Sequence, residues 1–416
     1  VPFCFADDMY FGDRDDRYKA WKNGEYSESG LAGESAEIWN KCYKGIRQAS
    51  IYLNNIDMNQ EYTAEELADN KAQAHFLKAY FYWMMLRLFG PVPIVTDQGI
   101  DYMEDYDAVA QPRNTYDECV TYITNELIMA AQGLPLNRAM QDIARPTRGA
   151  ALALRAKVLL YAASPLMNGK TPADIASEMI DDQGNRLLPD SYDESKWAKA
   201  AAAARDVIEG NWYKLYTAKF REEQVEGDYA NPKTIVPPYH PVYSKANFPD
   251  GWKDIDPLES YRSVFNGEVN FFNNPEMIFS RVINNGAELH PDLGDFSDVL
   301  DMVRHQMPAS LGGWNIHSMT MKQCDAYDMA DGTAFDRKKC LKGFAGPENK
   351  KDRPYDNLED GVWMGYANRE PRFYASVGYN GARWNCTSAT GDGSEVVKNQ
   401  QVWYYRGSKD GRSNNS

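Results

Sequence analysis

The chain has 416 residues, with 45 Lys and Arg against 60 Asp and Glu, so its formal net charge is −15. This charge excludes nucleic acid and anionic lipid headgroups as main partners, because both require a basic surface. The composition, 43% hydrophobic and 25% charged, is that of a globular protein, and no apolar run approaches the roughly 20 residues of a membrane span. Aromatic residues make up 13% of the chain, and we expect some of their rings to face solvent or a ligand.

The first half of the sequence predicts helices that come in pairs. Apolar residues recur at helical spacing over residues 35–57, and a second helix follows a capping box formed by Thr63 and Glu66. Gly90 and the prolines after it stop this helix, and residues 92–95 are predicted to be extended. Three more helices are predicted over residues 115–133, 147–164 and 194–210. Paired helices with large rings and small partner residues are typical of tetratricopeptide-like architecture.

After Tyr216 the sequence becomes rich in Pro, Gly, Asn and Asp, which favours turns and loops. Within this part we expect a helix over residues 319–327. Strands are expected over residues 277–283, 373–377 and 402–405. The sequence therefore predicts a mainly α protein in which loops lie over a helical scaffold.

Four motifs, in this order, resemble the SusD/RagB family. They are residues 86–94 (Leu-Arg-Leu-Phe-Gly-Pro-Val-Pro-Ile), the helix at 116–135, residues 145–161, and residues 368–373 (Asn-Arg-Glu-Pro-Arg-Phe). The resemblance spans about residues 36–405. It implies one SusD-like domain over residues 1–416, with tetratricopeptide-like helix pairs at 36–216 as a scaffold under a loop-rich part at 217–416, where short helices and strands occur.

The same resemblance implies a function. Family members are non-catalytic glycan-binding lipoproteins of Bacteroidetes, anchored in the outer membrane at the cell surface, that deliver oligosaccharides to a SusC-like, TonB-dependent transporter. The family's signal peptide and lipidated cysteine lie upstream of the helical region, and Cys4 has no apolar run before it, so we do not assign lipidation to Cys4. We expect membrane contact only through a lipid anchor that these residues do not include.

A sugar site requires flat rings for the apolar faces of the sugar and polar groups for its hydroxyls. Rings in helical stripes, including Trp39, Trp83, Tyr161 and Trp197, are predicted to be core, so the candidates are rings in loops. One group precedes the first helix, and a second follows the last long helix. The first group is Trp21, Asn23 and Tyr26, and the second is Tyr239, Tyr243, Trp252, Tyr261, Trp314 and Asn315. Each ring could instead pack a loop onto the scaffold, and the predicted platform combines Trp21 with one or two of Trp252, Tyr261 and Trp314.

The sequence shows no signature of catalysis or of a cofactor. It lacks a Ser-His-Asp order, a metal-ligand cluster, a Gly-rich phosphate loop and a reactive Cys setting, so no catalytic residue, metal site or cofactor is predicted. Residues 181–185 carry oxygens near a Gly turn, but they lack the spacing of a calcium loop. Cys42 and Cys119 fall at apolar helical positions and are predicted to be buried free thiols.

Two other functions remain open on the sequence. Hydrolases with an α/α-toroid fold also combine paired helices, aromatic residues and acidic charge, but they carry helix pairs throughout. A tetratricopeptide scaffold would bind peptides in a concave groove. The sequence does not name the glycan, although the net charge argues against highly sulfated or uronate-rich ligands.

Overall fold

The computed structural model describes most of the chain, as two compact units. The residues described are 7–11, 28–95, 97–98, 103, 105, 107, 110–224, 232–266, 268–280, 306–315, 317–384 and 400–411. The helical unit comprises Ser27–Lys214 and Glu276–Val282, and the loop-rich unit comprises Val1–Tyr26, Leu215–Pro275 and Ile283–Ser416. In the described part of the chain, every helix is too short or too polar to cross a membrane.

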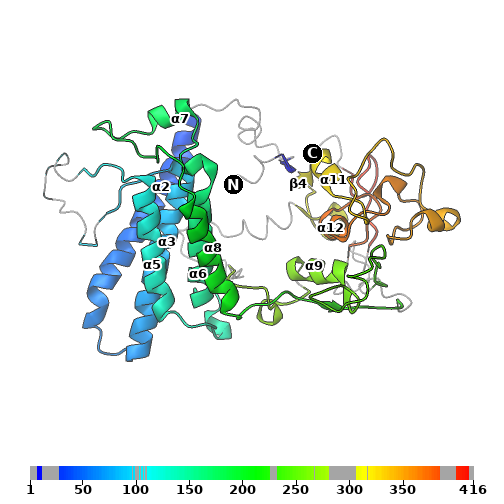
Figure 1. Cartoon of the computed structure of the whole chain (residues 1–416), viewed down its shortest axis with the longest axis horizontal. Helices are drawn as coiled ribbons and strands as arrows, with labels where there is room; N and C mark the ends of the chain where they lie inside the picture. Colours follow the sequence, from blue (N-terminus) through cyan, green and yellow to red (C-terminus); the bar gives the residue numbers. More distant parts are fainter. Residues whose placement is uncertain are drawn as a thin grey trace. The chain divides into compact units, whose positions relative to one another are not determined.

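In the described part of the helical unit, the α-helices run in sequence along the chain (Figure 1). They are α2 (Glu28–Asn55), α3 (Ala64–Phe89), α5 (Tyr116–Gly133), α6 (Arg148–Ala163), α7 (Ala173–Glu178) and α8 (Ser195–Glu209). Each long helix packs against the next one along the chain, from α2 with α3 to α6 with α8. This arrangement of sequential neighbours confirms the predicted tetratricopeptide-like scaffold.

The helix starts follow from local capping chemistry. In α3, Thr63 Oγ1 accepts a hydrogen bond from Glu66 N (3.2 Å), and the Glu66 carboxylate accepts one from Thr63 N (2.9 Å). Thr115 and Glu118 form the same reciprocal box at α5. These bonds satisfy amides that a helix leaves without partners in its first turn, so the sequence sets both boundaries.

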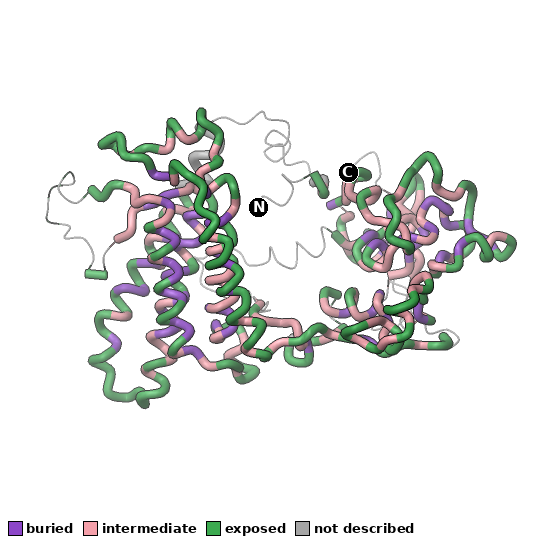
Figure 2. Tube along the Cα trace, in the orientation of Figure 1, coloured by how far each residue is buried: buried purple, intermediate pink, exposed green. Residues whose placement is uncertain are grey.

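The core of the helical unit lies between the helices, where the buried residues line the facing sides (Figure 2). Trp83, Cys42 and Cys119 are buried there, as predicted, and both cysteines are free. The prediction that Trp197 and Tyr161 are core residues is wrong, because these side chains are 39% and 43% exposed. Trp197 lies on α8, the last long helix in the described part of this unit, and Tyr161 of α6 packs its ring edge to face with Trp83, at 5.0 Å between centroids, while part of it stays exposed.

A buried polar network also crosses the helical unit. Lys78 of α3 is fully buried, and its ammonium forms ion pairs with Asp97 and with Glu126 of α5, the second at 3.5 Å. The other Glu126 oxygen lies 2.9 Å from His75 Nδ1, and Ser50 of α2 donates a hydrogen bond to Asp97 (3.0 Å). The network therefore joins α2, α3 and α5 to the extended segment that follows α3.

The loop-rich unit contains short elements and a small apolar core. Its strands and helices are β1 (Met9–Phe11), β2 (Ala218–Lys219), β3 (Ile255–Asp256), β4 (His317–Met319), α9 (Pro257–Phe265), α11 (Met321–Ala326) and α12 (Pro371–Ser376). Strand β1 pairs antiparallel with β4, with Met9 opposite Met319, and β2 pairs antiparallel with β3. The buried apolar cluster consists of Ala345, Leu358, Val362, Met364 and Ala367. Much of the described part of this unit consists of loops between these short elements. The helix predicted at 319–327 is confirmed as α11.

Three predicted strands are not observed. Residues 373–376 belong to helix α12. Proline at the first helical position has a φ that suits a helix, so Pro371 favours a helix start here, and the side chain of Phe373 is buried. Residues 402–405 form no strand, and a single bridge joins Arg383 to Gln401 beside them. Of residues 277–283, those up to 280 are not in a strand, and the rest lie outside the described residues.

Candidate functional site

A cavity of about 540 Å³ lies within the loop-rich unit. Its walls come from β1, β4, α11, α12 and the loops around residues 363–366, 376–384 and 404. This volume falls in the range of about 300–1,000 Å³ that small-molecule sites occupy in proteins. The cavity is therefore large enough to enclose a small ligand.

Aromatic rings form much of the cavity wall. Tyr366 makes ring contacts with both Trp363 and Tyr379, with 5.0 Å between centroids in each case. Phe373 stacks on Tyr379 at an interplanar angle of 15°. Trp384 and Tyr404 line the cavity as well. These contacts hold the rings in fixed orientations, which suits stacking against a flat apolar surface.

The tyrosines of the cavity stay protonated at neutral pH. Burial is the largest cause that raises the pKa of Tyr366, and the same holds for Tyr379 and Tyr404. Their hydroxyls therefore keep a proton that can be donated to a ligand oxygen. The wall thus combines apolar ring faces with hydroxyl donors.

Arg369 contributes a guanidinium to the floor of the cavity. Its side chain passes between two rings, with Cζ 3.9 Å from the Phe335 centroid and 4.4 Å from that of Phe373. Nη2 donates hydrogen bonds to the carbonyls of Cys324 (2.7 Å) and Tyr327 (2.6 Å). The residue is only 2% exposed, and burial lowers its pKa. These contacts fix the direction of the guanidinium.

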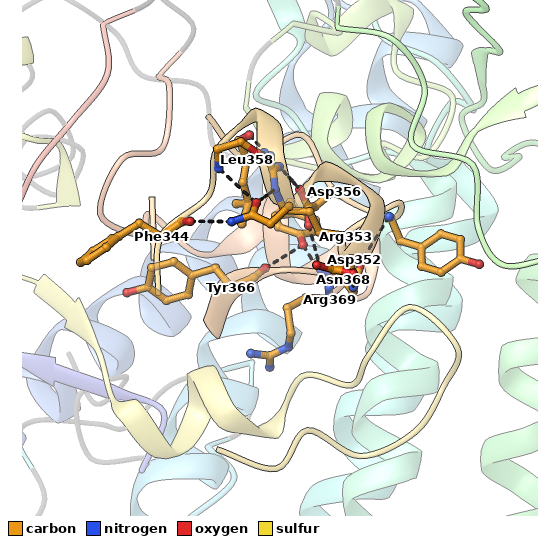
Figure 3. A network of polar contacts seen from close by, with 12 residues as sticks. Phe344, Asp352, Arg353, Asp356, Leu358, Tyr366, Asn368 and Arg369 are labelled. Carbon is orange, nitrogen blue, oxygen red and sulfur yellow. Dashed lines mark hydrogen bonds and ion pairs between the residues drawn. The ribbon is translucent and has the colours of Figure 1, made fainter. Parts of the chain in front are cut away.

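A second polar network holds the backbone that carries Arg369 (Figure 3). Asn368 has a positive φ of 55°, its N–H donates to Asp356 Oδ2 (3.1 Å), and its Nδ2 donates to the Asp352 carbonyl (2.8 Å). Arg353 pairs with Asp356 at 2.9 Å, and both side chains are almost fully buried. The guanidinium of Arg369 extends away from this network (Figure 3). The network therefore positions the side chain that enters the cavity.

The remaining charged groups on the wall form a pair. Arg337 donates two hydrogen bonds to the Asp325 carboxylate, one of them from Nε to Oδ2 at 2.9 Å. The Arg337 guanidinium also lies 5.9 Å from the centroid of Trp363. This pair is partly exposed, so its groups are accessible to a ligand as well as to each other.

The structure separates the residues that the sequence suggested for ligand binding. Asn315, which has a positive φ of 49°, lines the cavity. Trp252 lies in another cluster, 5.5 Å from Tyr243 by ring centroids, where Tyr243 stacks on His240 at 4.4 Å. The Trp252 indole nitrogen is buried and has no hydrogen-bond partner among the described residues.

The other suggested residues lie apart from these contacts. Tyr261 packs on Phe265 of the same helix, α9, at 5.3 Å. Trp314 is 45% exposed. Trp21, Asn23 and Tyr26 lie outside the described residues. Among the candidates that the structure describes, Asn315 is thus the one on the cavity wall, and the predicted platform stays a prediction.

Sequence reasoning missed the rings and charges that line the cavity. Trp363, Tyr366, Tyr379 and Trp384 occur among Gly and Asn residues, which was a usable signal of rings in loops. The strand predicted at 373–377 drew attention away from the loop rings on either side of it. Arg369 belongs to the motif at residues 368–373, and its bonds to carbonyls of residues 324–328 join that motif to a distant segment. Its position on the cavity was not foreseen.

The side chain of Asp181 closes the loop at residues 181–185. Asp181 Oδ1 accepts hydrogen bonds from the backbone amides of Gln183 (2.9 Å) and Asn185 (2.7 Å). Its Oδ2 accepts a bond from the Asn185 side chain at 2.9 Å. Both carboxylate oxygens therefore accept hydrogen bonds from within the turn.

Two family models match the chain. One is SusD-like and described as "Starch-binding associating with outer membrane", and it matches residues 8–160. The other, described as the SusD family, matches residues 275–416. The helical and the loop-rich parts of the chain are therefore each matched by a SusD-type model.

Two curated relatives are also similar to the chain. A SusD-like protein from Bacteroides ovatus is 25% identical over 224 residues, and a SusD-like protein from Formosa agariphila is 26% identical over 123 residues. The matches cover 50% and 30% of this chain, but 40% and 23% of the relatives. The matched stretches thus span less than half the length of either relative.

Solved structures show the same fold. BT4246 matches with a TM-score of 0.65 at 23% identity, over 92% of this chain and 61% of that chain. A SusD-like carbohydrate binding protein from Bacteroides fragilis matches with a TM-score of 0.55 at 17% identity, over 91% of this chain and 53% of that chain. These likenesses confirm the fold that the motifs imply.

Proposed function

The chain belongs to the SusD/RagB family, and on this premise we propose that it binds an oligosaccharide in the aromatic cavity of the loop-rich unit without cleaving it. The observation that carries the proposal is the composition of the cavity wall, where Trp363, Tyr366 and Tyr379 present rings beside hydroxyl, amide and guanidinium donors. Rings cover the apolar faces of a sugar, and the donors bond its hydroxyls.

The comparisons support carbohydrate as the ligand class. One matching family model is described as starch-binding, and the similar protein from Bacteroides fragilis is described as carbohydrate binding. A single cavity of this kind gives modest affinity, with a Kd of about micromolar to millimolar. The glycan itself is left open by these descriptions.

We extend the proposal to glycan uptake. The bound oligosaccharide passes to a SusC-like, TonB-dependent transporter, and the protein resides at the cell surface, attached to the outer membrane by a lipid anchor. Support comes from the outer-membrane association in the family description. The test is affinity isolation of the tagged protein from detergent-solubilised outer membranes, with a TonB-dependent transporter as the expected partner. Isolation with no such transporter, at full glycan affinity, would remove uptake from the proposal.

Native affinity electrophoresis tests the binding. The purified chain is run through gels that contain plant, microbial or host polysaccharides, and the gels are then stained for intact polymer. We expect retardation over intact polymer with at least one glycan. Clearing of the polymer along the lane would instead identify a hydrolase, and unchanged migration in every gel would contradict polysaccharide binding.

Matched tryptophan variants locate the site. Each stacked ring contributes about 0.5–1.5 kcal/mol beyond the area it buries, so Trp363→Ala is expected to weaken retardation about threefold or more. Trp252→Ala removes the same side chain from the separate Tyr243 cluster and should leave retardation unchanged. The reverse result would move the site to the Trp252 cluster. Circular dichroism of both variants is the check that they are folded.

A further inference from the structure

One donor group of Arg369 remains available to a ligand. Nη2 and Nε donate to the carbonyls of Cys324, Tyr327 and Asp328, and the rings of Phe335 and Phe373 flank the guanidinium. Nη1 makes no hydrogen bond with any residue that the structure describes. Arg369 lines the cavity, so this nitrogen offers two donors that are held in place before a ligand arrives.

Among the described residues, no carboxylate accepts a hydrogen bond from Arg369, although Asp325 and Glu370 attract its charge. Asp325 lines the wall, but it pairs with Arg337. Glu370, the residue after Arg369, pairs with Arg372 at 2.5 Å. Arg369 is therefore bonded only to carbonyl oxygens in the described residues. Buried charges are ordinarily paired with an opposite charge, because removing an ion from water is costly.

An anion bound at Nη1 would stabilise the buried positive charge of Arg369. Burial disfavours the charged form of Arg369, as the lowered pKa of its guanidinium indicates. A negative group within hydrogen-bond distance would stabilise that charge, and charge-assisted hydrogen bonds are roughly twice as strong as neutral ones. A neutral sugar hydroxyl would accept the bond but would add no opposite charge to the attraction that Asp325 and Glu370 already provide.

We propose that the preferred ligand carries an anionic group on a sugar ring, and that this group accepts hydrogen bonds from Arg369 Nη1 while the ring lies against the aromatic wall. This inference rests on the proposed glycan-binding function. A carboxylate of a uronate and a sulfate ester both supply the required chemistry.

The net charge of the whole chain argues against highly charged ligands at long range, but it does not set the charge inside the cavity. The total of −15 acts through solvent, where salt screens charges beyond a Debye length of about 8 Å at physiological ionic strength. Inside the cavity, the described carboxyl and guanidinium groups on the wall are Asp325, Arg337 and Arg369, which leave one positive charge in excess. The local balance therefore differs in sign from that of the chain.

Matched ligand pairs test the inference on the unmodified protein. The probes are an oligogalacturonide and a glucuronate-bearing xylan oligosaccharide, each beside its methyl ester, and a sulfated galactan oligosaccharide beside its desulfated form. Isothermal titration should show at least one charged probe binding about tenfold or more tighter than its neutral partner. This preference should shrink as salt rises from low to high concentration. Which pair shows the preference distinguishes carboxylate from sulfate.

A charge variant sharpens the test without touching Arg369, whose replacement could unfold the unit. Asp325→Asn removes the negative charge from the cavity wall and should favour the charged probe, so the affinity ratio of the charged probe to its neutral partner should rise. Asp182→Asn makes the same charge change at an exposed position away from the cavity wall and should change neither affinity.

Each remaining outcome counts against a defined claim. Equal affinity for charged and neutral partners, or binding of neutral glycans alone, would overturn the anionic ligand and leave the glycan-binding function standing. An equal response to Asp325→Asn and Asp182→Asn would overturn the role of the local charge balance. Absence of binding to every probe and every polysaccharide would overturn both proposals together.

Discussion

The helical unit and the loop-rich unit are stabilised in different ways. The helical unit buries a continuous apolar core between helices, which includes Trp83, Ile123 and Leu127. The loop-rich unit has a small apolar cluster, and buried polar side chains such as Arg353 and Arg369 bond its loops through backbone carbonyls. A scaffold can thus be formed by periodic packing, whereas a cavity with fixed side chains requires specific hydrogen bonds at its base.

The largest effect is expected where the loop-rich unit depends on a buried ion pair. Arg353→Ala leaves the Asp356 carboxylate buried and unpaired, which should lower the free energy of unfolding of this unit by about 3–5 kcal/mol. Urea unfolding followed by tryptophan fluorescence measures the loss. Arg406→Ala, at an exposed position of the same unit, is the control and should change the midpoint little. A similar midpoint for the two variants would contradict the contrast between the units.

A smaller effect is expected from a helix cap in the helical unit. Thr63→Ala removes the side chain that accepts a hydrogen bond from Glu66 N, at a cost of about 1 kcal/mol in the free energy of unfolding. Thr121→Ala is the matched control, because its hydroxyl bonds only a carbonyl within α5 and alanine favours the helix. Thermal unfolding followed by circular dichroism compares them. Equal stability of the two variants would show that the capping box does not stabilise α3.

The smallest effect is expected in the pH dependence of the helical unit. Burial alone would raise the pKa of Asp97, but hydrogen bonding and attraction to Lys78, with a hydrogen bond from Ser50, lower it on balance. A lowered pKa gives stability that is present above the unfolded value of about 3.9 and is lost as the pH falls through the folded value. Because the Asp97 side chain is 47% exposed, we expect a contribution of about 1 kcal/mol or less.

Unfolding at two pH values checks this sign. At pH 7 the wild type should be more stable than Asp97→Asn, and the difference should close as the pH falls well below about 3.9. Asp182→Asn, at an exposed position, should show no such closing gap. A gap that widens in acid would mean that the attraction to Lys78 does not govern Asp97.

The same contrast explains how far the sequence predicts the molecule. The predicted helix starts at Thr63, Thr115 and Thr147 match the observed caps, because the signals lie within one turn of the chain. Residues 373–377 were misassigned, because an alternating pattern over so few residues does not distinguish a strand from a short helix. Local signals are therefore sufficient for the scaffold and insufficient for the loops.

The cavity could be predicted only in part. Its residue types, rings in loops beside polar groups, follow from the sequence, and Asn315 was among the candidates. The choice of rings did not follow, because Trp363 and Tyr379 are brought to one wall by their contacts with Tyr366. The wall also depends on bonds between segments that are distant in sequence, such as those of Arg369 to the carbonyls of Cys324 and Tyr327. Nothing in the local sequence indicates that Trp252 packs in another cluster instead.

The adjacency of Asn368 and Arg369 has a consequence for how ligand preference can change by mutation. Asn368 bonds to residues 352–356 and, through its carbonyl, to Ala330, and the next residue supplies the cavity guanidinium, so a substitution at either position affects folding as well as recognition. Selection for a new sugar would therefore act more readily on the surrounding residues, such as Trp384 or Asp325, which make fewer bonds to the framework. We therefore expect the residue at the Arg369 position to change less readily by mutation than the residues around it on the cavity wall.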